Sequence, residues 1–333
     1  WLAQAINQGR KIGIFADFDV DGATSCAIFV RFFRHLGIDV PFYIPDRATE
    51  GYGPNLPAFQ SLKEQGVEIL LVVDCGTTAF DVIEGGKALG LEIAILDHHA
   101  AETRLPPADY CINPKREDDE SGLDMLAAVG VAYLAIVAVN AALRELGFYA
   151  CHDRPEAPLK DWLDLVALGT VCDMVPLNGP NRLFVKSGMI EMGRTQNPGL
   201  LAQTKTAGIE GDITLNHLGF SLGPRIIAGS RVSHSDLGAR LLCAACMEEA
   251  QNIAWLLDDC NDKRKTMQSR MARTAVARAK EMGAQDLSAL VVECPDGHTG
   301  LSGLVAGQLK DRYHKPACVI VYCENEHGEV EAR

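Results

Sequence analysis

Residues 12–22 read IGIFADFDVDG, an apolar run that leads into three aspartates at alternate positions, Asp17, Asp19 and Asp21. A short apolar run that is bounded by turn residues predicts a buried strand. The segment that follows, at 22–36, repeats large apolar residues every three or four positions and predicts a helix. A buried strand that runs directly into a helix is typical of the parallel sheet in an α/β protein.

The same order of strand and helix continues along the chain to residue 112. Apolar runs predict strands at 11–16, 40–44, 68–73, 92–96 and 109–112, and amphipathic patterns predict helices at 22–36, 55–65 and 78–89. From 121 to 200 the pattern is mostly helical. The sequence therefore predicts an α/β fold, with a parallel sheet that helices cover on both faces.

Aspartate and histidine side chains gather where these strands end. Asp74 follows the third strand and the triplet Asp97-His98-His99 follows the fourth, while Asp173 lies in a further apolar segment. Because the carboxyl ends of parallel strands share one edge, these side chains are expected to meet there. Crowded carboxylates repel one another unless a cation neutralises them. The pattern therefore predicts a site for more than one metal ion, and its oxygen-rich ligands favour Mn²⁺ or Mg²⁺ over structural zinc.

His98 and His99 are expected to differ in role. Neighbouring side chains on an extended backbone point in opposite directions, so one ring would bind metal and the other would face a substrate. Two ions about 4 Å apart can activate a water and stabilise the leaving oxygen in phosphoester hydrolysis. The predicted chemistry is therefore hydrolysis of a phosphate ester.

The composition sets the broad class. At 333 residues, the chain is long enough for about two domains. Its net charge of −13 argues mildly against a nucleic-acid partner, but four of the acids lie together at 117–120 and others belong to the predicted metal site. The 11 cysteines are scattered, several in apolar runs, which favours reduced thiols and a cytoplasmic location.

No apolar run approaches the roughly 20 residues that span a bilayer. Because the chain starts at Trp1, we expect a piece of a longer protein.

The C-terminal part has a helical segment followed by a second α/β unit. Segment 236–282 reads as one long helix or as two joined end to end. On a helical wheel drawn for residues 261–280, one half of the helix surface is basic and carries Lys263, Arg270, Arg273, Arg278 and Lys280. This face is either the solvated side of a connecting helix or a surface that follows phosphates. Beyond it we predict a strand at 287–292, a Gly-rich turn at 297–303, a helix, and a strand at 317–322.

These segments resemble the motifs of the DHH phosphoesterase superfamily, which is named for the triplet seen here at 97–99. Within it they are most similar to the RecJ family of 5′-to-3′ exonucleases specific for single-stranded DNA. The similarity covers residues 10–323 and rests on seven segments in the family's order: 15–25, 44–53, 74–76, 97–99, 168–177, 222–225 and 300–306.

The resemblance implies a set of metal ligands and a residue that meets the substrate. The implied ligands are Asp19, Asp21, Asp74, His98 and Asp173, with Asp17 as a further candidate. Asp19 would bind one ion and Asp21 the other, and Asp74 would bridge them. His98 and Asp173 would complete the second ion's shell, while His99 would meet the scissile phosphate. Asp97 would orient the ligands, a role that is also open to Asp17.

The resemblance also implies substrate contacts in the C-terminal half and in one loop of the sheet. The candidates are Arg47, Tyr52, Arg225, Arg231, His298, Gly300, Ser302 and Gly303. Gly300 and Gly303 are expected to let backbone amides approach an anion closely. The chain departs from the family at four positions, Ile227, Ser230, Gly307 and Gln308, so recognition of the 5′ end stays open.

The sequence thus predicts a DHH phosphoesterase domain at 1–200, a helical connector at 201–283 and an incomplete DHH-associated, substrate-binding domain at 284–333. The expected activity is Mn²⁺- or Mg²⁺-dependent 5′-to-3′ hydrolysis of single-stranded DNA, in recombination and repair. Two alternatives stay open: a DHH phosphodiesterase that acts on short oligonucleotides or cyclic dinucleotides, and a DHH module that binds without cleaving. We expect a monomer without a membrane partner, for which a single-strand-binding protein or a helicase is a candidate partner.

Overall fold

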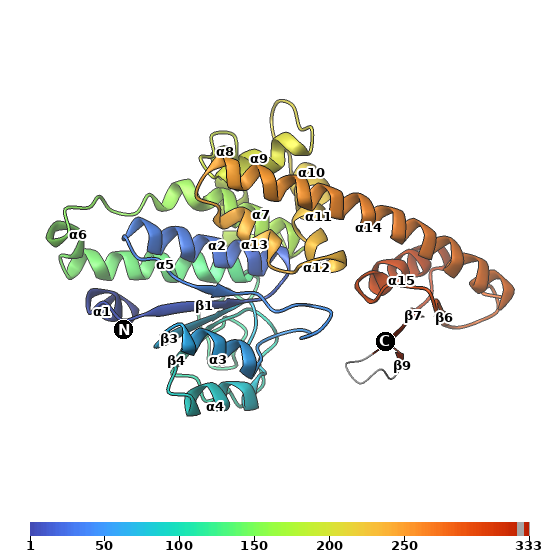
Figure 1. Cartoon of the computed structure of the whole chain (residues 1–333), viewed down its shortest axis with the longest axis horizontal. Coiled ribbons are helices and arrows are strands. Elements are labelled where there is room, and N and C mark those ends of the chain that lie inside the picture. Colours follow the sequence, from blue (N-terminus) through green and yellow to red (C-terminus); the bar gives the residue numbers. More distant parts are fainter. Residues whose placement is uncertain (325–329, 333) are drawn as a thin grey trace.

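The computed structural model describes residues 1–324 and 330–332 (Figure 1). Its centre is a parallel sheet of five strands in the order β2-β1-β3-β4-β5. The strands are β1 (Ile12–Ala16), β2 (Phe42–Tyr43), β3 (Ile69–Val73), β4 (Glu92–Leu96) and β5 (Tyr110–Ile112). All five predicted strands and the predicted parallel sheet are confirmed.

Alternate residues of the inner strands supply two separate cores. Ile14 and Leu71 enter the larger core, and their neighbours Phe15 and Val72 enter the smaller core on the opposite face. All four side chains are fully buried. This burial on both faces explains why the strands are continuous apolar runs rather than alternating ones.

Helices cover both faces of the sheet, as predicted (Figure 1). The larger core lies under α2 (Val20–His35), α5 (Ala128–Glu145) and α7 (Leu163–Cys172), and the smaller core under α3 (Leu56–Glu64) and α4 (Phe80–Ala88). The other helices of this part are α1 (Leu2–Asn7), α6 (Phe148–Cys151), α8 (Gly179–Met192), α9 (Pro198–Thr206), α10 (Leu215–His217), α11 (Gly223–Ile226), α12 (Ala228–Val232) and α13 (Leu237–Cys243). A 3₁₀ turn (Leu159–Trp162) and a π-helical turn (Leu218–Leu222) complete it.

One described helix, α5, has the length and apolar character of a membrane span, with 18 residues and a mean hydropathy of 1.5. Its Val129, Ala132 and Ile136 are fully buried in the larger core. The expectation that no apolar run approaches membrane length is therefore too strict at this helix, whose apolar residues serve the core of the sheet.

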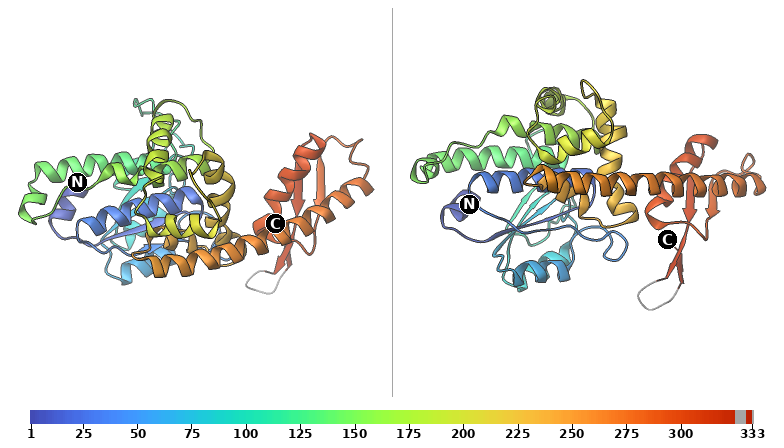
Figure 2. Two further views of the ribbon diagram at one scale, coloured as in Figure 1. Left: turned by 90° about the horizontal axis from the view of Figure 1, so that it is seen from above. Right: turned by 45° about the horizontal axis from the view of Figure 1, so that its top comes forward.

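Segment 236–282 forms two helices, α13 and α14 (Met247–Glu281), separated by a break at 244–246. The 35-residue α14 starts beside α9 and α13 and runs out to a small unit at the C-terminal end (Figure 2). Its Ala254 and Leu257 are buried in the larger core, whereas Met271 and Ala275 are buried in the core of the small unit. One continuous helix therefore belongs to both cores.

The small unit pairs β6 (Leu290–Glu293) with β7 (Ala317–Ile320) in parallel and packs α15 (Thr299–Tyr313) on them. β8 (Tyr322–Glu324) and β9 (Val330–Ala332) form an antiparallel pair. The predicted Gly-rich turn at 297–303 is wrong beyond residue 298, because α15 already begins at Thr299. The domain boundaries stay predictions, and the last of them, Arg333, lies outside the described residues, as do residues 325–329.

Candidate metal centre

The carboxyl edge of the sheet brings the predicted acidic clusters together. Asp17, Asp74 and Asp97 directly follow β1, β3 and β4, and each is at most 3% exposed. Asp173 approaches from the C-terminal end of α7, so it comes from a helix rather than from a strand. Four segments that are far apart in sequence therefore share one small, buried space.

The candidate ligands form three groups of three residues, and within each group the ligand atoms lie within 4.8 Å of one another. They are Asp17 with Asp19 and Asp74, Asp21 with His98 and Asp173, and Asp74 with His98 and His99. Asp74 belongs to two of these groups, as does His98. Asp19 and Asp21 thus fall in different groups, and Asp74 is grouped both with Asp19 and with His98, which belongs to the Asp21 group. Asp17 is among the possible ligands.

The backbone holds these carboxylates in place through local contacts. Asp19 caps α2 by accepting a hydrogen bond from the Gly22 N–H at 2.9 Å. Asp21 accepts from the Ala128 and Val129 N–H groups at 2.6 and 2.9 Å, at the positive end of α5. Asp74 has a φ of 60°, in the left-handed region that Asp and Asn enter more readily than other non-glycine residues.

His98 presents a lone pair to three carboxylates. Its Nδ1 lies 3.1 Å from the Leu126 carbonyl, which can only accept, so Nδ1 carries the proton. Burial, followed by the charge of His99, lowers the pKa of His98 to about 4, and the ring is neutral at pH 7. Its unprotonated Nε2 then lies 3.4 Å from Asp74 and 3.7 Å from both Asp21 and Asp173.

The donor atoms of this arrangement fit cations. The His98 Nε2, the Asp74 Oδ1 and the Asp173 Oδ2 are buried without a hydrogen-bond partner among the described residues, and so is Asp17 Oδ1. Burial, and then repulsion by neighbouring aspartates, raises the pKa values of Asp21 and Asp74 well above the ordinary range. Carboxylate oxygens with one imidazole are the donor set that suits Mn²⁺ or Mg²⁺, so the residues fit two divalent cations.

The metal-free protein is expected to lose stability as the pH rises from about 4 to about 7. Burial and the charge of Asp19 raise the pKa of Asp17 to about 7 and that of Asp173 to about 6, whereas an unfolded Asp titrates near 3.8. The folded state therefore binds more protons than the unfolded chain in this window, and the free energy of unfolding falls with pH. Melting temperatures measured in chelator across this range check the slope, and saturating Mn²⁺ should remove most of it. A flat or rising metal-free curve would contradict the assignment.

His99 makes contacts of a different kind. Its Nδ1 donates to Asp97 Oδ1 at 2.7 Å, and its Nε2 lies 3.2 Å from the Tyr52 hydroxyl. The hydrogen bond with Asp97 is the main cause of the raised pKa of His99. Burial would raise the pKa of Asp97, but hydrogen bonds from His99 and Thr77 outweigh it and leave that pKa below its ordinary value. The half-exposed His99 ring is therefore an oriented donor at the open side of the centre.

Two of the predicted substrate residues, Arg47 and Arg231, form a positive cluster with Arg264 beside the metal centre, and His298 lies next to it. Arg47 places its guanidinium 5.1 Å from the Phe18 ring centroid. Burial, followed by repulsion from Arg47 and Arg264, lowers the pKa of Arg231 to about 10, and burial with Arg47 lowers the pKa of His298. Sequence reasoning missed Arg264, because its position on the α14 wheel does not reveal which part of the helix passes the centre.

The other substrate predictions meet structural contacts instead. Arg225 pairs with Asp258 at 2.8 Å and so ties α11 to α14. The Gly300 N–H donates to His298 Nδ1, and a Cβ on Gly300 would lie 2.5 Å from the Arg231 carbonyl oxygen. Gly300 is thus required for the close approach of α15 to α12, and its amide is not free for an anion, contrary to the expectation from the sequence.

Ser302 and Gly303, the last two substrate candidates, lie in the first turns of α15. Ser302 donates its hydroxyl to the Thr299 carbonyl at 3.0 Å, and the space beside Gly303 is open. Their predicted contact with substrate stays a prediction.

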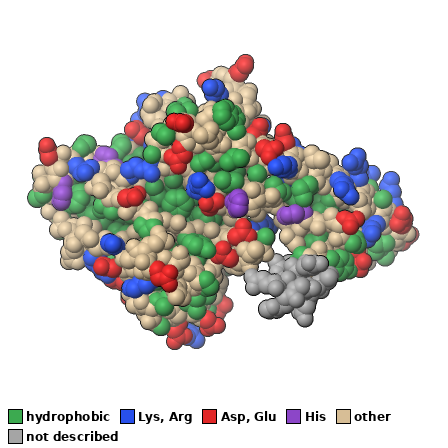
Figure 3. Space-filling view, in the orientation of Figure 1, with side chains coloured by type: hydrophobic (Ala, Val, Ile, Leu, Met, Phe, Trp, Pro, Cys, Tyr) green, Lys and Arg blue, Asp and Glu red, His purple; other side chains and the backbone are tan. Residues whose placement is uncertain are grey.

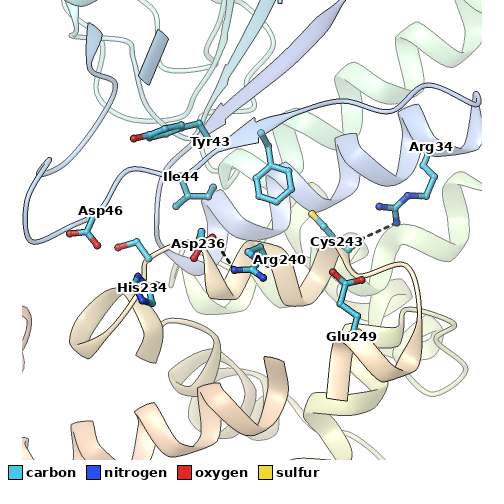
Figure 4. A pocket seen from close by; sticks show the side chains of 11 residues that line it. Arg34, Tyr43, Ile44, Asp46, His234, Asp236, Arg240, Cys243 and Glu249 are labelled. Carbon is cyan, nitrogen blue, oxygen red and sulfur yellow. Dashed lines mark hydrogen bonds and ion pairs between the residues drawn. The ribbon is translucent and has the colours of Figure 1, made fainter. Parts of the chain in front are cut away.

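A separate cavity of 610 Å³ lies between β2, α13 and the start of α14 (Figure 4). Arg34 donates to the Cys243 carbonyl at 3.0 Å, and Arg240 pairs with Asp236 at 3.4 Å, so its charges are partly satisfied within the protein. Among the described residues, no member of the clustered Asp and His set lines this cavity. It is therefore distinct from the candidate metal centre.

Comparison with known proteins agrees with this geometry. The DHH family, N-terminal domain, matches residues 11–170. Proteins named single-stranded-DNA-specific exonuclease RecJ are 36% identical in both Haemophilus influenzae and Bacillus subtilis, over 98% and 96% of this chain. The matches cover 57% and 39% of those relatives, so the chain spans about half the length of the curated relatives it matches.

Solved structures show the same likeness. A crystal structure of exonuclease RecJ bound to manganese has a TM-score of 0.81 and 30% identity, and the match covers 96% of this chain and 77% of that one. RecJ from Thermus thermophilus in complex with Mn²⁺ has a TM-score of 0.80 and 28% identity, over 100% of this chain and 46% of that one. With the DHH triplet at the carboxyl edge of the sheet and this likeness over nearly its whole length, the chain belongs to the RecJ family of DHH proteins.

Proposed function

We propose that this chain is the catalytic part of a metal-dependent exonuclease that removes nucleotides from the 5′ end of single-stranded DNA. The observation that carries the proposal is the His98 Nε2 lone pair, which faces Asp74 and two other carboxylates without a partner among the described residues. Buried carboxylates that face an unprotonated imidazole in this way repel one another at neutral pH, and bound cations would remove that repulsion. Family membership then favours phosphodiester hydrolysis over other metal chemistry.

The candidate ligands divide between two ions. Asp17, Asp19 and Asp74 would hold one, and Asp21, His98 and Asp173 the other, with Asp74 able to reach both. When bound, the two cations would activate a water and neutralise the leaving oxygen of a phosphodiester.

His99 would serve the substrate rather than the metal. Asp97 fixes its Nδ1 as a donor and favours the charged ring, so Nε2–H can donate to a phosphate oxygen once the Tyr52 hydroxyl gives way. A donor held in advance at this point stabilises the charge that develops during cleavage.

The positive cluster would receive the strand. Arg47 and Arg264 lie close enough to Arg231 for their charges to add to the effect of burial in lowering its pKa, and a chain of phosphates would relieve that repulsion. Exposed Arg270, Arg273 and Lys280 on the outer part of α14 would extend the track, where basic side chains are frequent in the space-filling view (Figure 3). The net charge of −13 is thus compatible with a nucleic-acid substrate, because its distribution matters more than its sum.

The biological setting is part of the same proposal. The protein would act as a monomer in the cytoplasm, in recombination and repair, and a single-strand-binding protein or a helicase would supply the strand. The predicted domains at 1–200, 201–283 and 284–333 would hold the metals, connect the two units and hold the substrate, respectively.

The experiment uses one strand labelled at its 5′ end and the same strand labelled at its 3′ end, each with Mn²⁺ or with chelator. Immediate release of a labelled mononucleotide from the first, and a shrinking ladder from the second, is expected only with metal. A duplex should resist, and a dinucleotide should be a poor substrate. The reverse polarity would refute the 5′-to-3′ assignment, and faster cleavage of the dinucleotide would favour a small-substrate phosphodiesterase.

A further inference from the structure

A cavity of 580 Å³ lies beside the metal centre, between the larger part of the molecule and α15. Val20 and Cys172 in its wall are direct chain neighbours of the candidate ligands Asp19, Asp21 and Asp173. The rest of the wall is mainly apolar and includes Val175, Leu177, Leu215, Phe220 and Leu304. This volume is in the range of pockets that bind a small molecule or one unit of a polymer.

Two side chains on its rim are exposed far beyond what apolar residues usually show. Met174 is 89% exposed and Phe220 is 81% exposed. Met174 also has a φ of 60°, a conformation that costs energy in an unbranched residue with a Cβ and that often marks a functional site. The fold thus keeps an apolar surface open next to a set of candidate catalytic residues.

The backbone around Phe220 is irregular for an identifiable reason. Phe220 lies in the π-helical turn Leu218–Leu222, and Pro224 follows two residues after the end of that turn. Proline has no N–H, and its ring clashes with the carbonyl four residues earlier, which here belongs to Phe220. The wider turn accommodates that ring, and turns of this kind are frequent at functional sites.

The polar part of the cavity wall is cationic. Arg231 and Arg264 line it, and no acidic residue does so within the part of the chain that the structure describes. Arg231 donates to the Gly300 carbonyl, and Arg264 to the side chains of Asn261 and Gln268, so both guanidinium groups bond only to neutral partners. Neither forms an ion pair among the described residues, so both charges are available to an anionic ligand.

We propose that this cavity binds an unpaired base of the DNA strand, stacked on Phe220 and Met174, while Arg231 and Arg264 hold the adjoining phosphate. The inference rests on the proposed function and adds to it the feature of the substrate that the enzyme recognises. A base offers an apolar face and is attached to an anion, which matches both parts of the wall. Stacking on an aromatic ring is tolerant of sequence, so the cavity selects any unpaired base and rejects one held in a duplex.

The test compares Phe220→Ala and Phe220→Trp with the unaltered protein in binding a labelled strand, with Ca²⁺ present to limit cleavage. Because Phe220 is largely exposed, Phe220→Ala should fold normally and weaken binding roughly 5- to 100-fold, whereas Phe220→Trp should bind as well as the original. Strands with one abasic nucleotide, moved stepwise from the 5′ end, then locate the base. At one position the abasic strand should bind as weakly as Phe220→Ala binds the intact strand, and the two losses should not add.

Leu183→Ala is the matched control, because Leu183 is 65% exposed on α8 and does not line the cavity. If Phe220→Ala binds intact and abasic strands as the unaltered protein does, while the latter still digests from the 5′ end, the base site is wrong and the proposed function stands. If the unaltered protein binds no single strand, both fail. A self-association that Phe220→Ala abolishes without any change in DNA binding would assign the apolar rim to a second copy of the chain and overturn the base site.

Discussion

Replacing Asp74 by Asn is expected to abolish hydrolysis and, at the same time, to stabilise the metal-free protein at neutral pH. Asp74 is 1% exposed and belongs to two of the three candidate ligand groups. Loss of a ligand that reaches both ions should lower turnover by more than the roughly 10- to 100-fold typical of residues that only support ligands. The pKa of Asp74 is raised by burial and by Asp19, Asp21 and Asp17, so its charge destabilises the empty site.

Asparagine is the informative substitution, because it keeps the shape of the side chain and tolerates the φ of 60° that alanine would not. Activity and melting temperature are measured with and without Mn²⁺. Metal should raise the melting temperature of the original protein and leave that of Asp74→Asn unchanged. Asp164→Asn is the control, since Asp164 is a buried carboxylate bonded to Thr195 at 2.5 Å outside the cluster. Substantial turnover in Asp74→Asn would rule out the bridging role.

Substitution of the two histidines by Gln is expected to separate metal binding from chemistry. His98→Gln should weaken Mn²⁺ binding and activity together, because the Nε2 lone pair toward Asp21, Asp74 and Asp173 is lost. His99→Gln should leave Mn²⁺ affinity unchanged and lower turnover by about 10²–10³, the usual cost of losing one donor to a developing charge. The reason is that Asp97 occupies the Nδ1 of His99, and its Nε2 meets Tyr52 at the open side.

Calorimetric titration with Mn²⁺ and single-turnover cleavage distinguish the two effects. The two variants should fall into different classes, one defective in both assays and the other in cleavage alone. Equal loss of Mn²⁺ binding in both would mean that His99 is also a ligand, which its place in a group with Asp74 and His98 would allow.

Much of the sheet could be predicted because its information is local. Runs such as 69–73 are apolar at every position and fully buried, so periodicity, length and burial agree. The clustered aspartates could be predicted for a related reason, since the edge that they share follows from parallel strands alone. The roles of single residues in the site stay predictions.

What the sequence could not indicate depends on contacts between distant segments. The sequence pattern puts Gly300 in a turn, whereas it sits in α15, where the Arg231 backbone leaves no room for a Cβ. Arg264 is one of several basic residues on one helix, and only the path of α14 brings it to the cavity. Asp173 joins the strand ends as predicted, but the segment before it is a helix, because its apolar residues fill a core beside the sheet.

The single helix that joins both cores restricts how the gene can change in length. Between Leu257 and Met271, α14 gives no described residue to either core, although Cys260 and Asn261 are buried there, so substitutions at exposed positions such as Lys265 and Ser269 should be tolerated. An inserted codon is different, because one extra residue turns everything beyond it by about 100° about the helix axis. Leu304 would swing away from the candidate metal centre with the rest of the small unit. We therefore expect in-frame insertions of one or two codons in this stretch to inactivate the protein without unfolding it, and insertions of about seven codons, which restore the rotation, to be less harmful.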